Sequence, residues 1–200
     1  MMIAAAIFGF SNRPVAADMA ESSNGESHVD EELRCEILHM KDLDQEARNA
    51  AISADKFIKL TKELDVRHTE RMKKIVARYG WPGKSLVGAD GASAAWLLVQ
   101  HAPDHKFMEK CLVLMQAAAE QGEVSRSDLA LLIDRVRIHQ GRPQLYGSQF
   151  KGGPDGTLVP EPIEDEDHVE ERRKSVGLPT MSEYTRIIRQ VYARPNPPPK

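Results

Sequence analysis

Polar residues placed inside apolar or turn-forming segments between residues 80 and 150 restrict how this chain can fold more than any other feature. Burying a charge or a ring nitrogen costs free energy unless a partner satisfies it. A chain that does this several times in one domain must build a polar network in its core or line a site. The segments concerned are Gly80-Trp81-Pro82, Gln100-His101, Asp134-Arg135 and Gln144-Leu145-Tyr146-Gly147-Ser148-Gln149.

Apolar residues at helical spacing, interrupted by glycine and proline, predict a mainly α fold of six or seven helices with one short β-hairpin. One helix is expected from Asp30 toward Leu64, with a break near residues 42–44. Asp65 has the chemistry of an N-cap for a second helix, which Gly80 and Pro82 end. Residues 80–91 are expected to form a loop, and the nearly all-apolar segment 92–102 a central helix.

Capping residues and breakers divide the rest of the chain. Asp104 is expected to cap a helix that runs to Gln121, and Ser125 or Ser127 a helix that runs through His139. Two segments, 144–150 and 157–163, flank a glycine-rich turn and predict the hairpin. Two further helices are expected over residues 166–176 and 181–192. The helical domain then covers residues 30–193, between a segment 1–29 and a proline-rich tail 194–200.

Composition excludes some classes of partner. The 200 residues are 41% hydrophobic and carry a net charge of -3. The chain therefore lacks the excess of basic residues that is typical of nucleic-acid-binding proteins, and nucleic acid is not a predicted partner. No apolar run approaches the roughly 20 residues needed to span a bilayer as a helix, and no transmembrane segment is predicted. The sequence names no other partner.

The N-terminal segment has two interpretations. Residues 1–10 are apolar and residues 15–17 resemble a small-residue cleavage site, as in an export signal. Against this, no Lys or Arg precedes the apolar stretch, and Arg13-Pro14 lies in the cleavage region, so the alternative is a disordered linker on a cytoplasmic protein. We favour export slightly. Cys35 and Cys111 would then be able to pair, whereas in the cytosol they would be small buried residues.

No cofactor or metal is assigned from the sequence. Gly83-Lys84-Ser85 lacks the glycine that a phosphate-binding loop needs five residues earlier, because Arg78 stands there. His101 and His105 have the spacing of a helical metal pair, but Pro103 lies between them and should break the helix. Neither cysteine has a second cysteine at metal-ligand spacing.

Three residues are candidates for catalysis: His101, Asp134 and Arg135. His101 lies on the helical face of Leu97 and Leu98, where a satisfied core histidine is the common alternative to a general acid or base. Asp134 and Arg135 interrupt a leucine-rich helix, so at least one of them should be buried. An ion pair that anchors a helix or loop is the favoured interpretation. Alternatively, Arg135 binds an anionic group and Asp134 orients His101.

The residues around Gly147 are candidates for binding. If the segment is a strand, Gln144, Tyr146 and Ser148 share one face of it. That face is either an amphipathic edge strand or a pocket wall to which Tyr146 and Gln149 contribute hydrogen bonds. Trp81 and Gln100 complete the candidate binding residues, and we expect His101, Asp134 or Arg135, and Tyr146 to converge.

These segments together resemble an uncharacterised bacterial family, the domain of unknown function family 6624, over about residues 60–190. The resemblance implies a helical domain with a short β element and no particular activity. Ser148 departs mildly from the family pattern, which usually has threonine there. The matching segments are Arg78-Tyr79-Gly80-Trp81-Pro82, Ser85-Leu86-Val87-Gly88, Ala94-Ala95-Trp96-Leu97-Leu98-Val99-Gln100-His101, Leu132-Ile133-Asp134-Arg135-Val136, Gln144-Leu145-Tyr146-Gly147-Ser148-Gln149-Phe150, Pro162-Ile163-Glu164-Asp165, Glu171-Arg172-Arg173 and Val176-Gly177-Leu178.

Two functional classes remain open on the sequence. The first is a small hydrolase with His101 as general acid or base. The second is a non-catalytic binding or effector module in which the polar residues hold loops in place. An open pocket at His101 would favour the first, and a sealed, hydrogen-bonded cluster the second.

Overall fold

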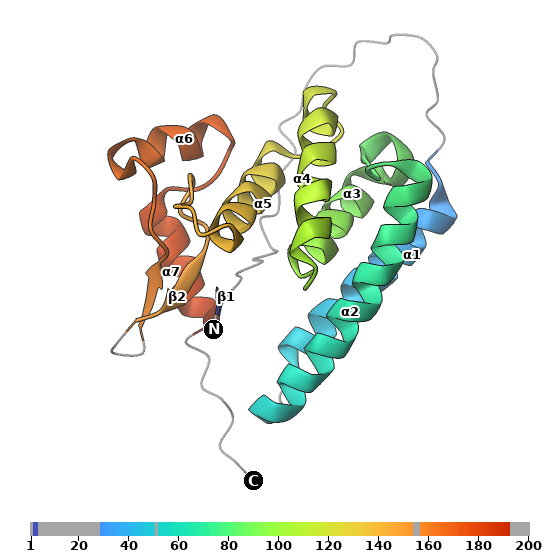
Figure 1. Cartoon of the computed structure of the whole chain (residues 1–200), viewed down its shortest axis with the longest axis horizontal. Coiled ribbons are helices and arrows are strands. Elements are labelled where there is room, and N and C mark those ends of the chain that lie inside the picture. The colour runs from blue at the N-terminus through green and yellow to red at the C-terminus, as the bar shows by residue number, and fades with distance from the viewer. Residues whose placement is uncertain (1, 4–28, 51, 154–156, 193–200) are drawn as a thin grey trace, which may run out of the picture.

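The computed structural model describes residues 2–3, 29–50, 52–153 and 157–192 (Figure 1). Within these residues the chain forms seven α-helices, one short 3₁₀ helix and a small antiparallel sheet. The predicted mainly α fold with a short hairpin is confirmed. Apart from Met2, Ile3 and Val29, the segment expected to be a signal or linker lies outside the described residues, as does the tail 194–200.

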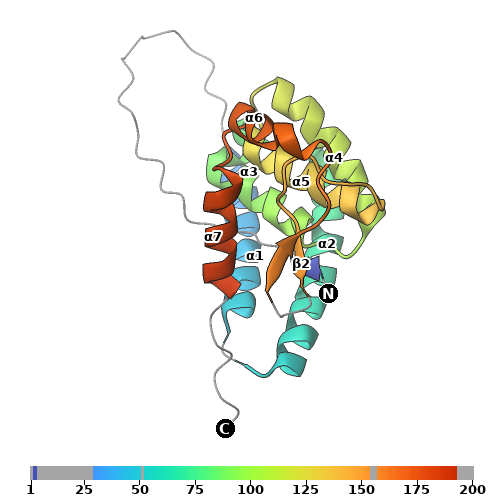
Figure 2. The ribbon, with the colours of Figure 1, turned by 90° about the vertical axis from the view of Figure 1, so that its left-hand side faces the viewer.

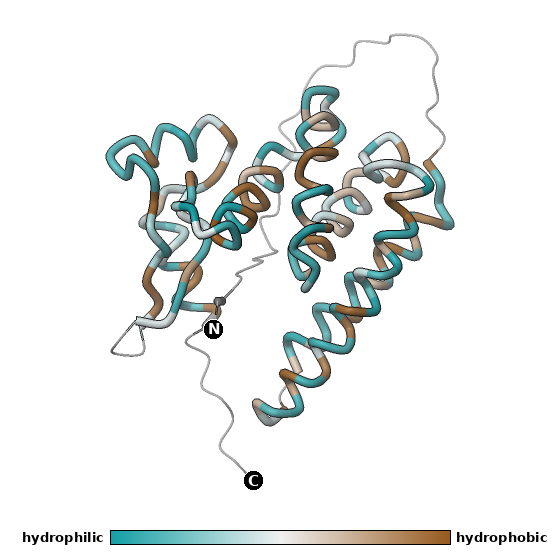
Figure 3. The backbone as a smooth tube through the Cα atoms, viewed as in Figure 1, coloured by the Kyte–Doolittle hydropathy of each residue, from teal (hydrophilic) through white to brown (hydrophobic). Residues whose placement is uncertain are grey.

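The first two helices correct the expected boundary. α1 (Glu31–Asn49) is capped by Asp30, whose carboxylate accepts the Leu33 N–H at 2.9 Å. α2 (Ala54–Tyr79) begins after Ser53 and runs through Asp65. The prediction that Asp65 caps a helix was therefore wrong, because the chain turns after Asn49 without a glycine or proline to mark the turn. α2 carries apolar residues at intervals along a mostly hydrophilic helix (Figure 3), and Gly80 ends it as predicted.

The third helix begins earlier than predicted. α3 (Lys84–Gln100) starts inside the segment expected to be a loop and bends at Gly88, whose φ of 73° is not helical. Glu123 replaces the missing cap, because its carboxylate accepts the Ser85 N–H at 2.7 Å and its carbonyl accepts the Lys84 N–H. From Gly91 onward almost every residue is buried, which confirms the central helix.

The next two helices begin at predicted caps. α4 (His105–Glu120) is capped by Asp104 and α5 (Arg126–His139) by Ser125. Together α1 to α5 form the main hydrophobic core. The ends of α1 and α2 that meet at the turn project beyond the other helices in both views (Figures 1 and 2).

Among the described residues, no helix combines the length and apolar character needed to cross a membrane. Cys35 is exposed and Cys111 buried, and both are free thiols.

Residues 144–153 and 157–192 form a C-terminal lobe on the far side of α5 from α1–α4 (Figure 1). Strand β2 (Phe150–Gly152) pairs with β3 (Leu158–Pro160), and β1 (Met2–Ile3) pairs with the other edge of β2. The turn η1 (Glu166–His168), α6 (Val169–Ser175) and α7 (Met181–Tyr192) follow. The predicted first strand is wrong over residues 144–149, which form a loop. A small second core contains Phe150, Leu158, Tyr184 and Ile188.

Candidate functional site

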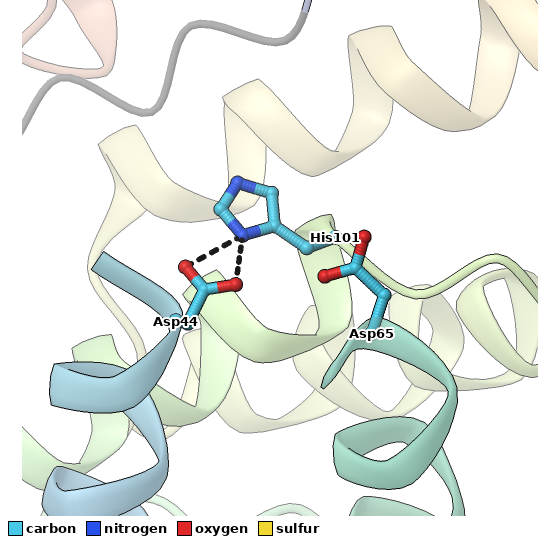
Figure 4. A group of neighbouring side chains, drawn as sticks. All are labelled: Asp44, Asp65 and His101. Carbon is cyan, nitrogen blue, oxygen red and sulfur yellow. Dashed lines mark hydrogen bonds and ion pairs between the residues drawn. The ribbon is translucent and has the colours of Figure 1, made fainter. Parts of the chain in front are cut away.

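His101 is held by a carboxylate from another helix. It is the C-cap residue of α3, and its side chain is only 5% exposed. The ring nitrogen Nδ1 lies 3.0 Å from both carboxylate oxygens of Asp44, which comes from α1 and is itself buried (Figure 4). The other ring nitrogen, Nε2, points away from this carboxylate.

Arg48 and Asp65 complete this group, which we call the His101 cluster (Asp44, Arg48, Asp65 and His101). Arg48 follows Asp44 by one helical turn, and its Nε donates to the two Asp44 oxygens at 3.1 and 3.2 Å. Its terminal nitrogen donates to Asp65 Oδ1 at 2.5 Å. One guanidinium therefore bridges two carboxylates from two helices and fixes α1, α2 and the end of α3 relative to one another.

The position of the imidazole proton follows from these contacts. The Arg48 Nε–H points at Nδ1 at 3.1 Å, but the same N–H also donates to the two Asp44 oxygens, which lie 3.0 Å from Nδ1 and can only accept. A bare Nδ1 would direct its lone pair at a carboxylate, whereas a protonated Nδ1 makes a charge-assisted hydrogen bond to it. We therefore assign the proton to Nδ1 and the lone pair to Nε2. Burial lowers the pKa of His101 to about 4, although Asp44 opposes the shift, so the ring is neutral near pH 7.

The carboxyl groups of Asp44 and Asp65 differ in pKa. Burial alone would raise the pKa of Asp44, but His101 and Arg48 together bring that pKa below its ordinary value. Burial raises the pKa of Asp65 to about 6, and the contact with Arg48 does not cancel this rise. The reason is that a single guanidinium charge is shared by the buried Asp44 and the partly buried Asp65, and the charge of Asp44 itself disfavours ionisation of Asp65.

The His101 cluster also has the composition of a metal site. One ligand atom each from Asp44, Asp65 and His101 lies within 4.8 Å of the others. His68 lies one turn after Asp65 on α2 and is 3% exposed. Within the described residues neither of its ring nitrogens has a hydrogen-bond partner. Burial lowers the pKa of His68, so this ring is also neutral near pH 7.

A second polar group surrounds Asp134, and we call it the loop cluster (Asp134 and residues 144–149). The buried Asp134 carboxylate accepts the backbone N–H groups of Leu145, Tyr146 and Ser148 at 2.7, 2.9 and 2.9 Å. Burial raises the pKa of Asp134, while these hydrogen bonds oppose the rise. Asp134 therefore anchors a loop through backbone N–H groups, whereas the favoured interpretation expected an ion pair to anchor it.

Further side chains hold the same loop. Gln144 donates to the carbonyls of Gln149 and Glu161 and accepts the Gln149 N–H. Arg173 is completely buried and donates to the Tyr146 carbonyl. At Gly147 φ is +69°, and a Cβ there would lie 2.5 Å from the Met181 sulfur, so the loop needs glycine at this position.

The predicted site residues consequently fall into separate groups. Among the described residues, Asp134 and Tyr146 form hydrogen bonds within the loop cluster and none with His101, whereas Asp44 makes the contact with His101 that was expected of Asp134. Arg135 is buried on α5, where its positive charge disfavours the protonated form of His101.

The remaining binding candidates lie elsewhere. Tyr146 is half-buried in the loop cluster, and Gln144 and Gln149 hydrogen-bond within it. Trp81 packs against the main core, and Gln100 donates to the Leu131 carbonyl at 3.4 Å. None of these contacts places them in the His101 cluster.

Asp44, Arg48 and Asp65 were not among the predicted site residues, although the sequence contains a signal for the two carboxylates. Asp44 occupies a position in the apolar stripe of α1 between Met40 and Ala47, and it is buried like them. Asp65 lies on the inner face of α2 between Thr61 and Met72. A charged residue at a stripe position requires a partner, but nothing in the spacing identifies that partner as His101.

The comparison with family models gives one match, to a family of unknown function (DUF6624), over residues 31–195. No curated protein and no solved structure matches the chain. The matched region contains both the His101 cluster and the loop cluster, and it covers most of the chain. The protein therefore belongs to the family of unknown function DUF6624.

Proposed function

We propose that this protein is a small hydrolase in which His101 acts as the general acid and base. The observation that carries the proposal is the contact between the Asp44 carboxylate and His101 Nδ1. A carboxylate in this position fixes the orientation and tautomer of the ring and stabilises the imidazolium that forms when Nε2 accepts a proton. Asp44 is then a positioning residue, and His101 contacts the reacting water.

Such a reaction moves one proton through His101. Nε2 removes a proton from a water molecule as its oxygen attacks the substrate, and the proton is then donated to the leaving group. Within the His101 cluster, the parts nearest solvent are the side chains of Arg48 and Asp65, which are 26% and 18% exposed. Substrate would have to approach from this side or displace a covering residue.

The low exposure of His101 and the hydrogen bonds of its cluster match the sealed arrangement expected of the second candidate. A ring that is 5% exposed and held by a buried carboxylate also suits a structural polar cluster that joins α1, α2 and α3. In this case the protein is a non-catalytic binding or effector module.

Substitution of His101 separates the two candidates. Purified full-length protein and its His101→Gln and Asp44→Asn variants would be assayed on p-nitrophenyl acetate and p-nitrophenyl phosphate, with circular dichroism to verify folding. A hydrolase predicts turnover by the wild type and a loss of about 10²–10⁴-fold in His101→Gln, the usual contribution of general acid–base catalysis.

His168→Gln is the matched control, because His168 makes the same kind of contact with Asp165 at 2.8 Å but is exposed. Its turnover should equal that of the wild type. Equal turnover in His101→Gln, or no wild-type turnover on either probe together with a lower melting temperature in His101→Gln, would contradict the hydrolase and support the structural module.

A further inference from the structure

We propose that the His101 cluster is also a binding site for a divalent transition-metal ion, which enters when the Arg48 side chain leaves. Metal binding at this site would not depend on acid–base catalysis. Asp44, Asp65 and His101 come from three different helices and still bring ligand atoms within 4.8 Å of one another.

The distance between His101 and Asp44 suits two ligands of one metal ion. Ligand oxygens and nitrogens lie about 2.0–2.2 Å from a bound zinc ion, which places two ligands of one ion roughly 3 Å apart or slightly more. The 3.0 Å between His101 Nδ1 and the Asp44 oxygens falls at the short end of this range. Two carboxylates and an imidazole favour Zn²⁺ or a neighbouring transition metal over Mg²⁺ and Ca²⁺, which prefer all-oxygen ligands.

Arg48 occupies the position that the ion would take. Its guanidinium contacts all three prospective ligands, at 3.1 Å from His101 Nδ1, 3.1 Å from Asp44 and 2.5 Å from Asp65. A single positive charge faces one buried and one partly buried carboxylate there, whereas a divalent ion would supply two charges. Arg48 is 26% exposed and sits in the last turn of α1, so its side chain has a path to solvent.

His68 supplies an independent observation. Its ring is buried on the same face of α2 as Asp65, one turn further along, and both nitrogens lack a partner within the described residues. The charges of Asp44 and Arg48 both act on this ring. A neutral, buried imidazole one helical turn after Asp65, with no hydrogen-bond partner among the described residues, has a lone pair available for a cation or for its bound water.

Metal binding would exclude the acid–base arrangement. Ligation requires the Nδ1 lone pair, so the proton of the neutral ring moves to Nε2 and the total number of protons is unchanged. With Nε2 protonated, His101 no longer accepts a proton from water. Zn²⁺ would therefore inhibit any turnover that depends on His101.

Zinc titration of the full-length protein tests the site without a substrate. Isothermal titration calorimetry should show one Zn²⁺ bound per chain, and excess Mg²⁺ should not displace it. Asp65→Asn should weaken binding by more than about tenfold. Asp55→Asn, an exposed change on the same helix, should leave the affinity unchanged.

Arg48→Gln distinguishes this site from adventitious zinc binding. If Arg48 competes with the ion, its removal should tighten binding by about tenfold, a coupling typical of groups in contact. Cys35→Ser and His139→Gln, at residues outside the cluster, should bind like the wild type. Circular dichroism verifies that each variant folds; should Arg48→Gln not fold, the comparison of wild type with Asp65→Asn decides.

Several outcomes would overturn the proposal. Zinc binding that survives Asp65→Asn, or that disappears in Cys35→Ser or His139→Gln, would place the ion elsewhere. An absence of binding in both the wild type and folded Arg48→Gln would show that the cluster holds no metal. Because binding is measured directly, either result leaves the acid–base proposal to its own test.

Discussion

Individual buried charges in this protein are stabilised in two different ways. Asp44 is stabilised by the Arg48 guanidinium and the His101 N–H, whereas Asp134 is stabilised by three backbone N–H groups of one loop. The second arrangement needs no counter-charge, because several N–H donors distribute the carboxylate charge. It also makes the conformation of residues 145–148 depend on a single side chain.

Removing the Asp134 side chain should therefore destabilise the fold strongly. In Asp134→Ala, the N–H groups of Leu145, Tyr146 and Ser148 lose their acceptor, and each unsatisfied buried group costs about 1–3 kcal/mol. We expect the free energy of unfolding to fall by about 3 kcal/mol or more, as measured by urea denaturation.

Asp167→Ala provides the matched control, because Asp167 is exposed in η1. Its unfolding free energy should stay within about 0.5 kcal/mol of the wild-type value. A similarly small loss in Asp134→Ala would mean that the loop is held by its other contacts, notably those of Gln144 and Arg173.

At the scale of elements, local chemistry predicted most helix ends but not all. Asp104, Ser125 and Gly80 mark ends that the structure confirms, since caps and glycine act through nearby backbone groups. The turn after Asn49 has no glycine, and Ser53, the N-cap residue of α2, makes no side-chain capping hydrogen bond. α3 begins where Glu123, distant in sequence, accepts its first N–H groups. Ends that depend on such remote partners cannot be read from local sequence.

The contact between α4 and α5 should depend on pH. The rings of His105 and His139 stack with centroids 3.7 Å apart, at the start of α4 and the end of α5. Burial and then the neighbouring His105 lower the pKa of His139 to about 4, from an ordinary value near 6.5. Between these values the unfolded chain binds more protons than the folded one, so the stabilisation is complete above about pH 6.5 and is lost as pH falls toward 4.

Urea denaturation at several pH values would measure this effect. His101 shifts in the same direction, so the informative quantity is the difference between wild type and His139→Gln, which should lose less stability than the wild type between pH 6.5 and 4. His168→Gln should lose more stability than the wild type over the same pH range. The reason is that Asp165 raises the pKa of His168, so protonation of His168 stabilises the folded wild type as pH falls. Identical pH profiles for wild type and His139→Gln would show that the stacked pair contributes nothing.

At the scale of the whole molecule, the segments that stood out in the sequence serve two separate purposes. The motif from Gln144 to Gln149 joins the C-terminal lobe to α5 through Asp134, so its polar residues are structural contacts of the loop. His101 belongs instead to the junction of α1, α2 and α3. The sequence identified His101 as unusual, but its partner Asp44 lies 57 residues away, and only the folded chain brings them together.

The protonation state of the His101 ring tests the central claim most directly. Nitrogen-15 NMR of the labelled full-length protein near pH 7, with His101→Gln used to assign the signal, reports which ring nitrogen carries the proton. The structure predicts a neutral ring with the proton on Nδ1 and a bare Nε2, and a loss of this single tautomer in Asp44→Asn. A wild-type ring that is protonated on Nε2, or on both nitrogens, would contradict the assignment of His101 as a base oriented by Asp44.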